Sequence, residues 1–312
     1  MTVVRGAGTF PGSCTARPRP GGHQGATGVS TAFGTFGELL QGVLPAPDGD
    51  FLVTLPVARW TTASFSVDPA GRGVEVRPAH KTKARHLVET MLAGFGVPGG
   101  GLLTIDSGLP EGKGMASSSA DLVATARAVA NALRLEVTPR QIEELLGRIE
   151  PTDGVLYQAV VAFDHRRVRL RAVLGSLPTM TIVAVDEGGT VDTVAFNRIE
   201  KPFTAADRRE YARLLDRITA AVAARDLAEV GAVATRSAEM NQMLRPKRTL
   251  DAVRAVARDV GALGVAAAHS GTMLGVLLAT DDPDHAERVA ATVAACSALG
   301  GQVSLHRTLC FD

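Results

Sequence analysis

Residues Leu109–Asp121 read LPEGKGMASSSAD and place two glycines, a lysine and three serines directly before an apolar helical pattern. Glycine and serine are poor helix formers, yet the segment 120–135 that follows has strong helix formers and apolar residues at helical spacing. The segment 101–110 ahead of it reads as a strand. The sequence therefore predicts a strand that leads through a glycine-rich turn into the N-terminus of a helix.

This arrangement suits the binding of an anion such as a phosphate, because the first N–H groups of a helix lack intrahelical partners and the helix dipole adds positive charge there. Gly112 and Gly114 would let the backbone approach a phosphate, the serine hydroxyls could donate to it, and Lys113 could meet it as a point charge. The structural alternative is that the serines cap the helix, the glycines form a tight turn and Lys113 is an ordinary loop lysine. The stretch matches neither the P-loop nor the dinucleotide fingerprint.

The composition excludes several classes of protein. The chain has 312 residues, 46% of them hydrophobic, which is typical of a folded globular protein. Its 33 basic and 32 acidic residues leave a net charge of +1, which argues against a dedicated nucleic-acid binder. Its cysteines, Cys14, Cys296 and Cys310, are an odd number and far apart, so neither a disulfide framework nor a zinc site is predicted. We therefore expect a cytoplasmic protein with no nucleic-acid partner.

Two segments resemble targeting or membrane signals. Residues 1–30 are rich in Gly, Pro, Ser, Thr and Arg and contain no carboxylate, but they lack the apolar core of a signal peptide. Their composition predicts a disordered tail. Residues 260–279 approach membrane-spanning length, but they include four glycines, His269 and Ser270, and two aspartates follow them. A buried strand, turn and strand is the preferred interpretation of 260–279, so no membrane association is expected.

The rest of the chain mixes strands and helices without a regular βα alternation, which favours the α+β class. A domain boundary is predicted near residues 175–179. A capping box is predicted at Thr138, with Pro139 behind it and Gln141 three residues on. Strands are expected at 51–57, 61–68, 73–78, 180–188 and 301–309, a hairpin at 156–175, and helices at 86–96, 138–150, 205–224, 227–243, 250–263 and 284–299.

Three segments resemble the motifs of the GHMP small-molecule kinases. The second motif of that family is a proline, three variable residues and Gly-Leu-Gly-Ser-Ser-Ala. Residues 31–42, TAFGTFGELLQG, resemble motif one, and residues 266–279, AAAHSGTMLGVLLA, resemble the glycine-rich motif three. Three motifs in the right order across most of the chain are far more specific than any one of them. The positions that match motif two are Pro110, Gly114, Met115, Ala116, Ser117 and Ser118.

Within this family, four segments resemble those of the kinases that phosphorylate L-threonine in cobalamin side-chain synthesis and propanediol utilisation. The segments are GELLQG, GKGMASSSAD, RIEPTDG and AHSGT. The chain departs from that group at Phe33 and Phe36, where proline and cysteine are expected. Motif one touches the substrate in this family. The departures therefore put the exact substrate in question more than the reaction.

The resemblance implies a two-domain fold. Residues 31–176 would form an ATP-binding half like the second domain of ribosomal protein S5, and residues 177–312 a ferredoxin-like half, with the site in the cleft between them. It also implies transfer of phosphate from ATP, with Mg²⁺, to the hydroxyl of a small amino acid, most readily L-threonine. The alternatives are a kinase of another hydroxy amino acid or amino alcohol, and a catalytically silent nucleotide-binding regulator. A homodimer is left open.

The same resemblance assigns the nucleotide and metal residues. Ser118 would approach Mg²⁺, and Glu150 in RIEPTDG would be the metal carboxylate, although the family's usual spacing leaves Glu143 and Glu144 as alternatives. Asp153 would receive or orient the proton of the attacking hydroxyl, and its alternative is a turn residue that bonds its own backbone. Lys113 is a second catalytic candidate. The expected cofactor-binding residues are Pro110, Gly112, Lys113, Gly114, Met115, Ala116, Ser117, Ser118 and Ser119.

Binding of the acceptor is expected at motifs one and three. An amino acid carries an ammonium and a carboxylate, so Glu38 and Gln41 suit its recognition, and the alternative for them is an exposed helix start. Asn241 could face the same pocket with Arg245 and Lys247, although a solvated helix end is expected for the two cations. The other substrate candidates are His269, Ser270 and Gly271 in the C-terminal glycine loop. For His269 a satisfied core histidine is the more usual role.

Overall fold

The computed structural model describes residues 25–47, 49–191, 199 and 201–312. Most of the predicted tail, residues 1–24, lies outside the described residues. Its last part is corrected, because strand β1 begins at Thr27 and the hydroxyls of Thr27 and Ser66 lie 2.8 Å apart. Residues 27–30 therefore belong to the sheet and not to a tail.

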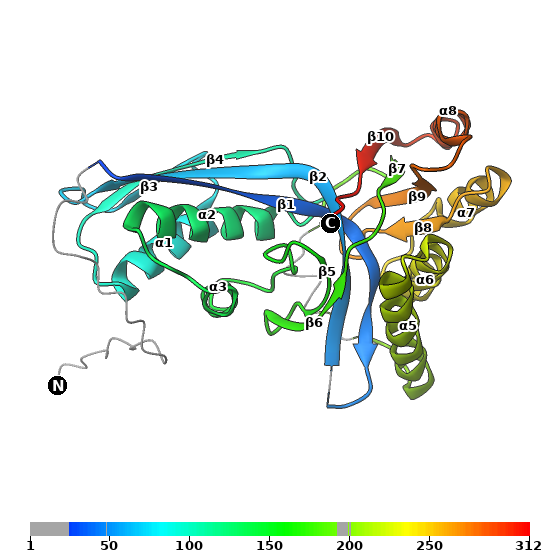
Figure 1. The fold of residues 1–312 in the computed structure, drawn as a ribbon, viewed down its shortest axis with the longest axis horizontal. Coiled ribbons are helices and arrows are strands. Elements are labelled where there is room, and N and C mark those ends of the chain that lie inside the picture. Colours follow the sequence, from blue (N-terminus) through cyan, green and yellow to red (C-terminus); the bar gives the residue numbers. More distant parts are fainter. Residues whose placement is uncertain (1–24, 48, 192–198, 200) are drawn as a thin grey trace.

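The N-terminal half is a twisted sheet with helices on one face (Figure 1). Its strands pair in the order β1-β2-β4-β3, antiparallel except for β3 with β4. The predicted strands at 51–57 and 61–68 are one continuous strand, because β2 pairs with β1 along its length and absorbs a register shift near Phe33. The bounds of these elements are β1 Thr27–Leu44, β2 Gly49–Asp68, β3 Val74–Arg77, β4 Gly100–Ser107, α1 Thr82–Gly94, α2 Ser117–Leu133 and α3 Pro139–Leu146.

Helix α2 packs closely against β1 because the side chains at the contact are small. The helix is rich in buried alanines, and a Cβ placed on Gly28 of β1 would lie 2.2 Å from the carbonyl oxygen of Ala128. Helix α3 has the predicted capping box at Thr138 and Gln141, but it ends at Leu146 and not near Glu150. The residues after α3 are consequently free to form the turn that carries Glu150 and Asp153.

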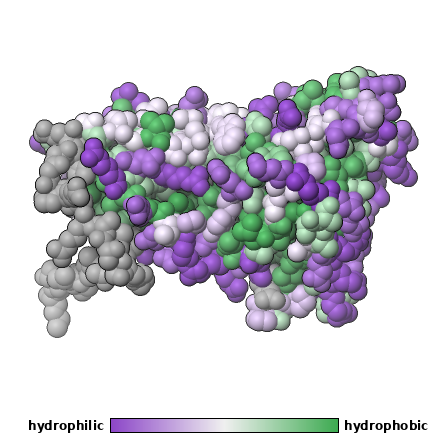
Figure 2. All heavy atoms as spheres, viewed as in Figure 1, coloured by the Kyte–Doolittle hydropathy of each residue, from purple (hydrophilic) through white to green (hydrophobic). Residues whose placement is uncertain are grey.

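The predicted hairpin after α3 is confirmed. Strands β5 (Val160–Asp164) and β6 (Arg169–Gly175) pair antiparallel, and β5 also pairs with β2 opposite Leu52. Hydrophobic residues gather on the visible face over this hairpin, whereas α5 and α6 present a mostly hydrophilic surface (Figure 2). Because β5 pairs with β2 near Leu52, the residues that follow β5 lie near the last part of β1 and the start of β2.

The C-terminal half is an antiparallel sheet in the order β10-β7-β9-β8, with helices packed on it (Figure 1). Residues 260–279 contain β8, a turn and β9, as predicted from the sequence. No helix in the part of the chain that the structure describes is long and apolar enough to cross a membrane. The bounds are β7 Met180–Asp186, α5 Ala205–Ala224, α6 Leu227–Met240, η1 Asn241–Met243, α7 Leu250–Asp259, β8 Gly264–Ala267, β9 Met273–Ala279, α8 His285–Ser297 and β10 Gln302–Arg307.

One sheet runs through both halves of the molecule. Strand β8 pairs with β1 at Glu38 and Ala267, which joins the two sheets edge to edge. The end of the chain returns to the N-terminal half, where Thr308 forms a bridge with Val57. The domain boundary between residues 176 and 177 stays a prediction. Strands from both sides of that boundary belong to one sheet. Motif one lies on β1 at this junction, so the fold places it beside motif three.

Candidate active site

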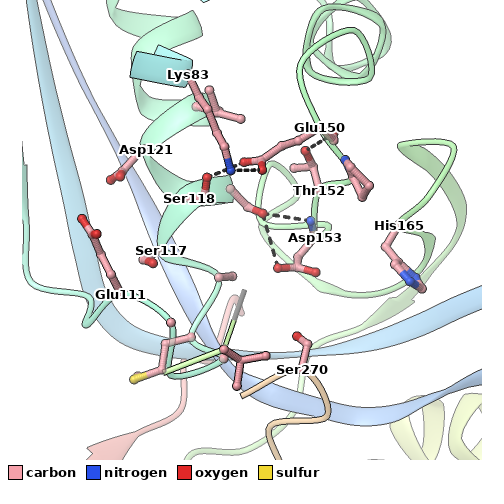
Figure 3. A pocket seen from close by; sticks show the side chains of 18 of the residues that line it. Lys83, Glu111, Ser117, Ser118, Asp121, Glu150, Thr152, Asp153, His165 and Ser270 are labelled. Atoms are coloured by element: carbon pink, nitrogen blue, oxygen red, sulfur yellow. Dashed lines mark hydrogen bonds and ion pairs between the residues drawn. The ribbon is translucent and has the colours of Figure 1, made fainter. Parts of the chain in front are cut away.

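The three motifs meet at a cavity of about 330 Å³. The walls come from β1, the segment before α1, the glycine-rich turn, the start of α2 and the turn after α3. Figure 3 shows Asp153 and Glu150 facing the serines of α2, with Lys83 beside Glu150. The predicted residues among those lining it are Glu38, Gln41, Gly112, Gly114, Met115, Ala116, Ser117, Ser118, Ser119, Glu150, Asp153 and Ser270.

The N-terminus of α2 is open toward this cavity. The helix begins at Ser117, and its N-cap residue is Ala116, which has a left-handed φ of 55°. Among the described residues no side chain caps this end, so the structural alternative in which serines cap the helix is not what is observed. The N–H groups of the first turn and the helix dipole are therefore available to an anion.

The three motifs are interlocked at the backbone. The N–H of Gly37 in motif one donates to the carbonyl of Gly114 in motif two at 2.9 Å. A Cβ on Gly271 of motif three would lie 2.1 Å from the carbonyl oxygen of Lys113, and a Cβ on Gly114 would lie 2.5 Å from Cβ of Ala268. Only glycine permits these approaches, which explains why the glycines occur at these places in the sequence.

Ser118 and Glu150 form the part of the site that could hold a metal. The Ser118 hydroxyl donates to Oε1 of Glu150, and Nζ of Lys83 lies 2.5 Å from its Oε2. Magnesium usually takes one or two protein oxygens and completes its shell with phosphates and water. These two adjacent oxygen donors beside an anion site fit that requirement. Within the described ranges, no group of three or more His, Cys, Asp or Glu could bind a metal without such added ligands.

The alternative metal carboxylates lie elsewhere. Glu143 is buried and accepts hydrogen bonds from the Tyr157 hydroxyl at 2.9 Å and the Leu170 N–H at 2.6 Å. Glu144 pairs with Arg140 on the surface of α3 at 3.1 Å. Of the three glutamates, Glu150 is the one that lines the cavity.

Asp153 is held at the centre of the cavity by Ser119. Its N–H donates to the Ser119 hydroxyl at 3.0 Å, and that hydroxyl lies 3.3 Å from Oδ2 of Asp153. Burial, with the nearby charges of Glu38 and Glu150, raises the pKa of Asp153 to about 7 despite the Ser119 hydrogen bond. A carboxylate with such a pKa can accept a proton near neutral pH. Ser119 was predicted to bind phosphate, but its hydroxyl is engaged with Asp153.

Lys113 was predicted to meet a phosphate in the cavity, but it lies outside the cavity lining. Its ammonium pairs with Asp186 at 2.6 Å and donates to the carbonyl of Gly189 at 2.7 Å. The lysine thus ties the glycine-rich turn to the end of β7, because Asp186 offers it a fixed opposite charge. Pro110 is exposed and also lies outside the cavity lining.

Glu38 and Gln41 are buried in β1 and are not at an exposed helix start. The Glu38 carboxylate accepts from the backbone of His269 at 3.2 Å and lies 2.8 Å from its Nδ1, while Nε2 of His269 lies 2.8 Å from the Ser237 hydroxyl. His269 is 1% exposed and lies outside the cavity lining. It therefore has the structural role of a satisfied core histidine and orients Glu38.

The other residues predicted to face the acceptor, Asn241, Arg245 and Lys247, do not line the cavity. Asn241 is 2% exposed and lies outside the cavity lining. Arg245 and Lys247 were expected at a solvated helix end, but both donate to the carbonyl of Gly271, Arg245 at 3.0 Å. Burial lowers the pKa of Lys247 to about 8. These side chains fix the loop that packs on the glycine-rich turn.

Several lining residues escaped the sequence analysis. Lys81 donates to Asp121 at 2.6 Å and to Glu111 at 2.5 Å, and Lys83 pairs with Glu150. The run HKTKARH over residues 80–86 was a signal for this cationic segment. His165 also lines the cavity, but a lone histidine after a strand gives no comparable signal.

Comparisons with known proteins identify the family of the chain. The family model "GHMP kinases N terminal domain" matches residues 82–163, and "GHMP kinases C terminal" matches residues 218–298. The L-threonine kinase of Citrobacter freundii is 27% identical over 243 residues, covering 78% of this chain and 83% of the relative. The L-threonine kinase of Salmonella typhimurium strain LT2 is 28% identical over 247 residues, covering 78% of this chain and 80% of the relative.

Solved structures share the fold at low sequence identity. Homoserine kinase from Cytophaga hutchinsonii superposes with a TM-score of 0.70 at 14% identity and covers 91% of this chain and 95% of its own. Mevalonate kinase from L. major has a TM-score of 0.65 at 15% identity and covers 92% and 96%. With both family domains matched, the three motifs assembled around one cavity and the α+β fold shared, the chain belongs to the GHMP kinase family.

Proposed function

We propose that the protein transfers the γ-phosphate of ATP, with Mg²⁺, to the side-chain hydroxyl of a small hydroxy amino acid, most readily L-threonine. The observation that supports this best is the position of Asp153. Its carboxylate, which has a raised pKa, accepts a hydrogen bond from Ser119. Ser119 lies in the first turn of α2, whose open N-terminus suits a phosphate.

The nucleotide would bind along the glycine-rich turn. The N–H groups at the start of α2 would hold its phosphates, and Lys83 would add positive charge beside them. The remainder of the nucleotide would extend toward Asp121, which lies on the opposite side of Asp153 from His165 (Figure 3) and accepts a hydrogen bond from Lys81. Ser118 and Glu150 would hold Mg²⁺, which neutralises phosphate charge when it is bound.

Asp153 would act on the acceptor. Its carboxylate would accept the proton of the hydroxyl while the hydroxyl oxygen bonds to the γ-phosphorus and the bond from that phosphorus to ADP breaks. The proton would then pass to solvent when the products leave. Ser119 orients the carboxylate, and Glu38, held by His269, contributes negative charge nearby. Most of the catalysis would come from positioning and charge neutralisation.

Similarity to two L-threonine kinases supports L-threonine as the acceptor. Phe33 and Phe36 depart from that group in motif one, but they are buried and lie outside the cavity lining. Another hydroxy amino acid or an amino alcohol is the alternative acceptor. A cytoplasmic location and a place in cobalamin side-chain synthesis belong to the same proposal. A silent nucleotide-binding regulator is disfavoured by the retained Ser118, Glu150 and Asp153 in one cavity.

The test is ATP turnover with purified protein and Mg²⁺, screened over L-threonine, L-serine, L-homoserine and amino alcohols. We expect the highest kcat/KM with L-threonine and a phosphomonoester of its hydroxyl in the ³¹P NMR spectrum. If ATP binds but none of these acceptors is phosphorylated, the proposed function is wrong and the regulator is favoured.

A further inference from the structure

His165 is a buried polar residue that lines the cavity without a partner. It is 2% exposed, and among the residues that the structure describes neither of its ring nitrogens has a hydrogen-bond partner. Buried polar groups in folded proteins are nearly always satisfied by protein, water or ligand, because an unpaired one is costly. An imidazole with both nitrogens unpaired, in the wall of a site, is therefore a candidate for pairing with a bound ligand.

Gln41, which lines the same cavity, carries a second unpaired polar group. Its backbone N–H donates to the Ser237 hydroxyl at 3.1 Å, whereas its side-chain Oε1 is buried and finds no partner within the described part of the chain. Strand pairing explains why the two residues lie on the same face of the sheet. Gln41 pairs with Leu52, Leu52 pairs with Phe163, and His165 follows two residues later on the same face.

The chemistry of the two groups is complementary. Burial, with a smaller contribution from the positive charge of Lys201, lowers the pKa of His165 to about 3. The ring is therefore neutral near pH 7. A neutral imidazole offers one N–H donor and one acceptor nitrogen, whereas the free oxygen of Gln41 can only accept, so of these two unpaired groups only the imidazole can donate to an anion. The carboxylate of Glu38 lies on the Gln41 side of the site in the same strand. His165 thus suits an anionic group and Gln41 a cationic one.

We propose that His165 and Gln41 determine the acceptor class: the His165 N–H binds the α-carboxylate of an amino acid, and Gln41 Oε1 binds its α-ammonium. This assignment rests on the proposed function and names what selects its substrate. The hydroxyl of the amino acid then faces Asp153, which lies between His165 and the nucleotide end in Figure 3. Hydroxy compounds that lack either charged group leave a buried polar side chain unpaired and are rejected.

The test compares L-threonine with L-threoninol, which lacks the carboxylate, in wild type and in His165→Phe. The phenyl ring is slightly larger than the imidazole and has no group that can donate a hydrogen bond to a substrate. We expect the KM for L-threonine to rise roughly 10- to 100-fold, the loss of one hydrogen bond to a charged group. The KM for L-threoninol and for ATP should change little, so the preference for L-threonine falls by the same factor.

The matched control is His306→Phe. His306 is also buried, with Nδ1 open among the described residues, but it lies on β10 outside the cavity lining. It should leave the preference for L-threonine unchanged. In parallel, Gln41→Met should reduce the preference for L-threonine over 3-hydroxybutyrate, which lacks the ammonium. If His165→Phe fails to fold, the same comparison is made with His165→Leu and Gln41→Met.

A preference that stays within about twofold of wild type in the folded variants, while wild type phosphorylates L-threonine, would overturn the assignment and leave the proposed function standing. The assignment would also be overturned if the wild-type enzyme phosphorylated L-threoninol and 3-hydroxybutyrate with the same kcat/KM as L-threonine. Failure of wild type to phosphorylate any hydroxy amino acid is a different result and refutes both proposals.

Discussion

Replacement of Asp153 by asparagine should make the protein slower and more stable at the same time. Asparagine keeps the size of the side chain and can retain the hydrogen bond with Ser119, but it removes the charge and the basicity. General-base catalysis contributes roughly 10²- to 10⁴-fold, so kcat should fall by about that factor. ATP affinity should survive, because Asp153 lies between the nucleotide end and His165.

The gain in stability follows from the raised pKa of Asp153. Burial, Glu38 and Glu150 raise that pKa from 3.8 to about 7, which corresponds to at most about 4 kcal/mol. Partial exposure to the cavity reduces the expected gain to about 1–2 kcal/mol, or roughly 2–6 °C in Tm. Below pH 4 the carboxyl is protonated in both states and the gain vanishes. It grows as the pH rises and is complete above pH 7, where the wild type must keep a buried charge.

Thermal unfolding of wild type and Asp153→Asn between pH 4 and pH 8, with turnover measured on the same samples, tests this argument. Asp164→Asn is the matched control, because Asp164 is also buried but accepts from the Arg167 N–H and pairs with that guanidinium at 3.2 Å. That variant should lose stability. An Asp153→Asn variant whose Tm is unchanged at pH 8 and whose kcat is near wild type would refute both the raised pKa and the role as a base.

Three further predictions concern other parts of the molecule. Gly114→Val places a side chain 2.5 Å from Ala268 at a φ of 84°, and should weaken ATP binding roughly tenfold or more by calorimetry; unchanged affinity in a folded variant would exclude the turn as the phosphate site. Glu150→Gln should lower turnover, and raised Mg²⁺ should partly restore it; a magnesium-independent defect would assign the metal elsewhere. Deletion of residues 1–24 should leave Tm nearly unchanged, whereas deletion of 1–30 should lower it by removing the start of β1, and equal effects of the two deletions would contradict this account.

The sequence predicted local features well where local chemistry decides them. The capping box at Thr138, the hairpin after α3 and the strand, turn and strand at 260–279 all have turn or cap residues at fixed offsets. Motif one was harder to interpret. Strand β1 is buried on both faces over most of its length, so it lacks the alternation that marks a strand, and Glu38 therefore resembled a residue at a helix start.

The directions of side chains at the site could not be predicted, because they depend on partners far away in sequence. Lys113 turns to Asp186, which lies 73 residues further along the chain, and Lys83 meets Glu150 across 67 residues. Ser119 binds Asp153 instead of a phosphate for the same reason. Motif spacing places the backbone of the turn, whereas the fold decides which hydroxyl or ammonium remains free for a ligand.

The single sheet that crosses both halves limits how this protein can be taken apart. Motif one sits on β1 where β8 joins it, and the N–H of Leu309 near the C-terminus donates to the carbonyl of Pro56 at 3.0 Å. A chain cut near residue 176 would expose unpaired strand edges on both fragments, which would favour aggregation over independent folding. An active chimera that combined one half of this chain with the other half of a relative would need residues that preserve these contacts between the two halves.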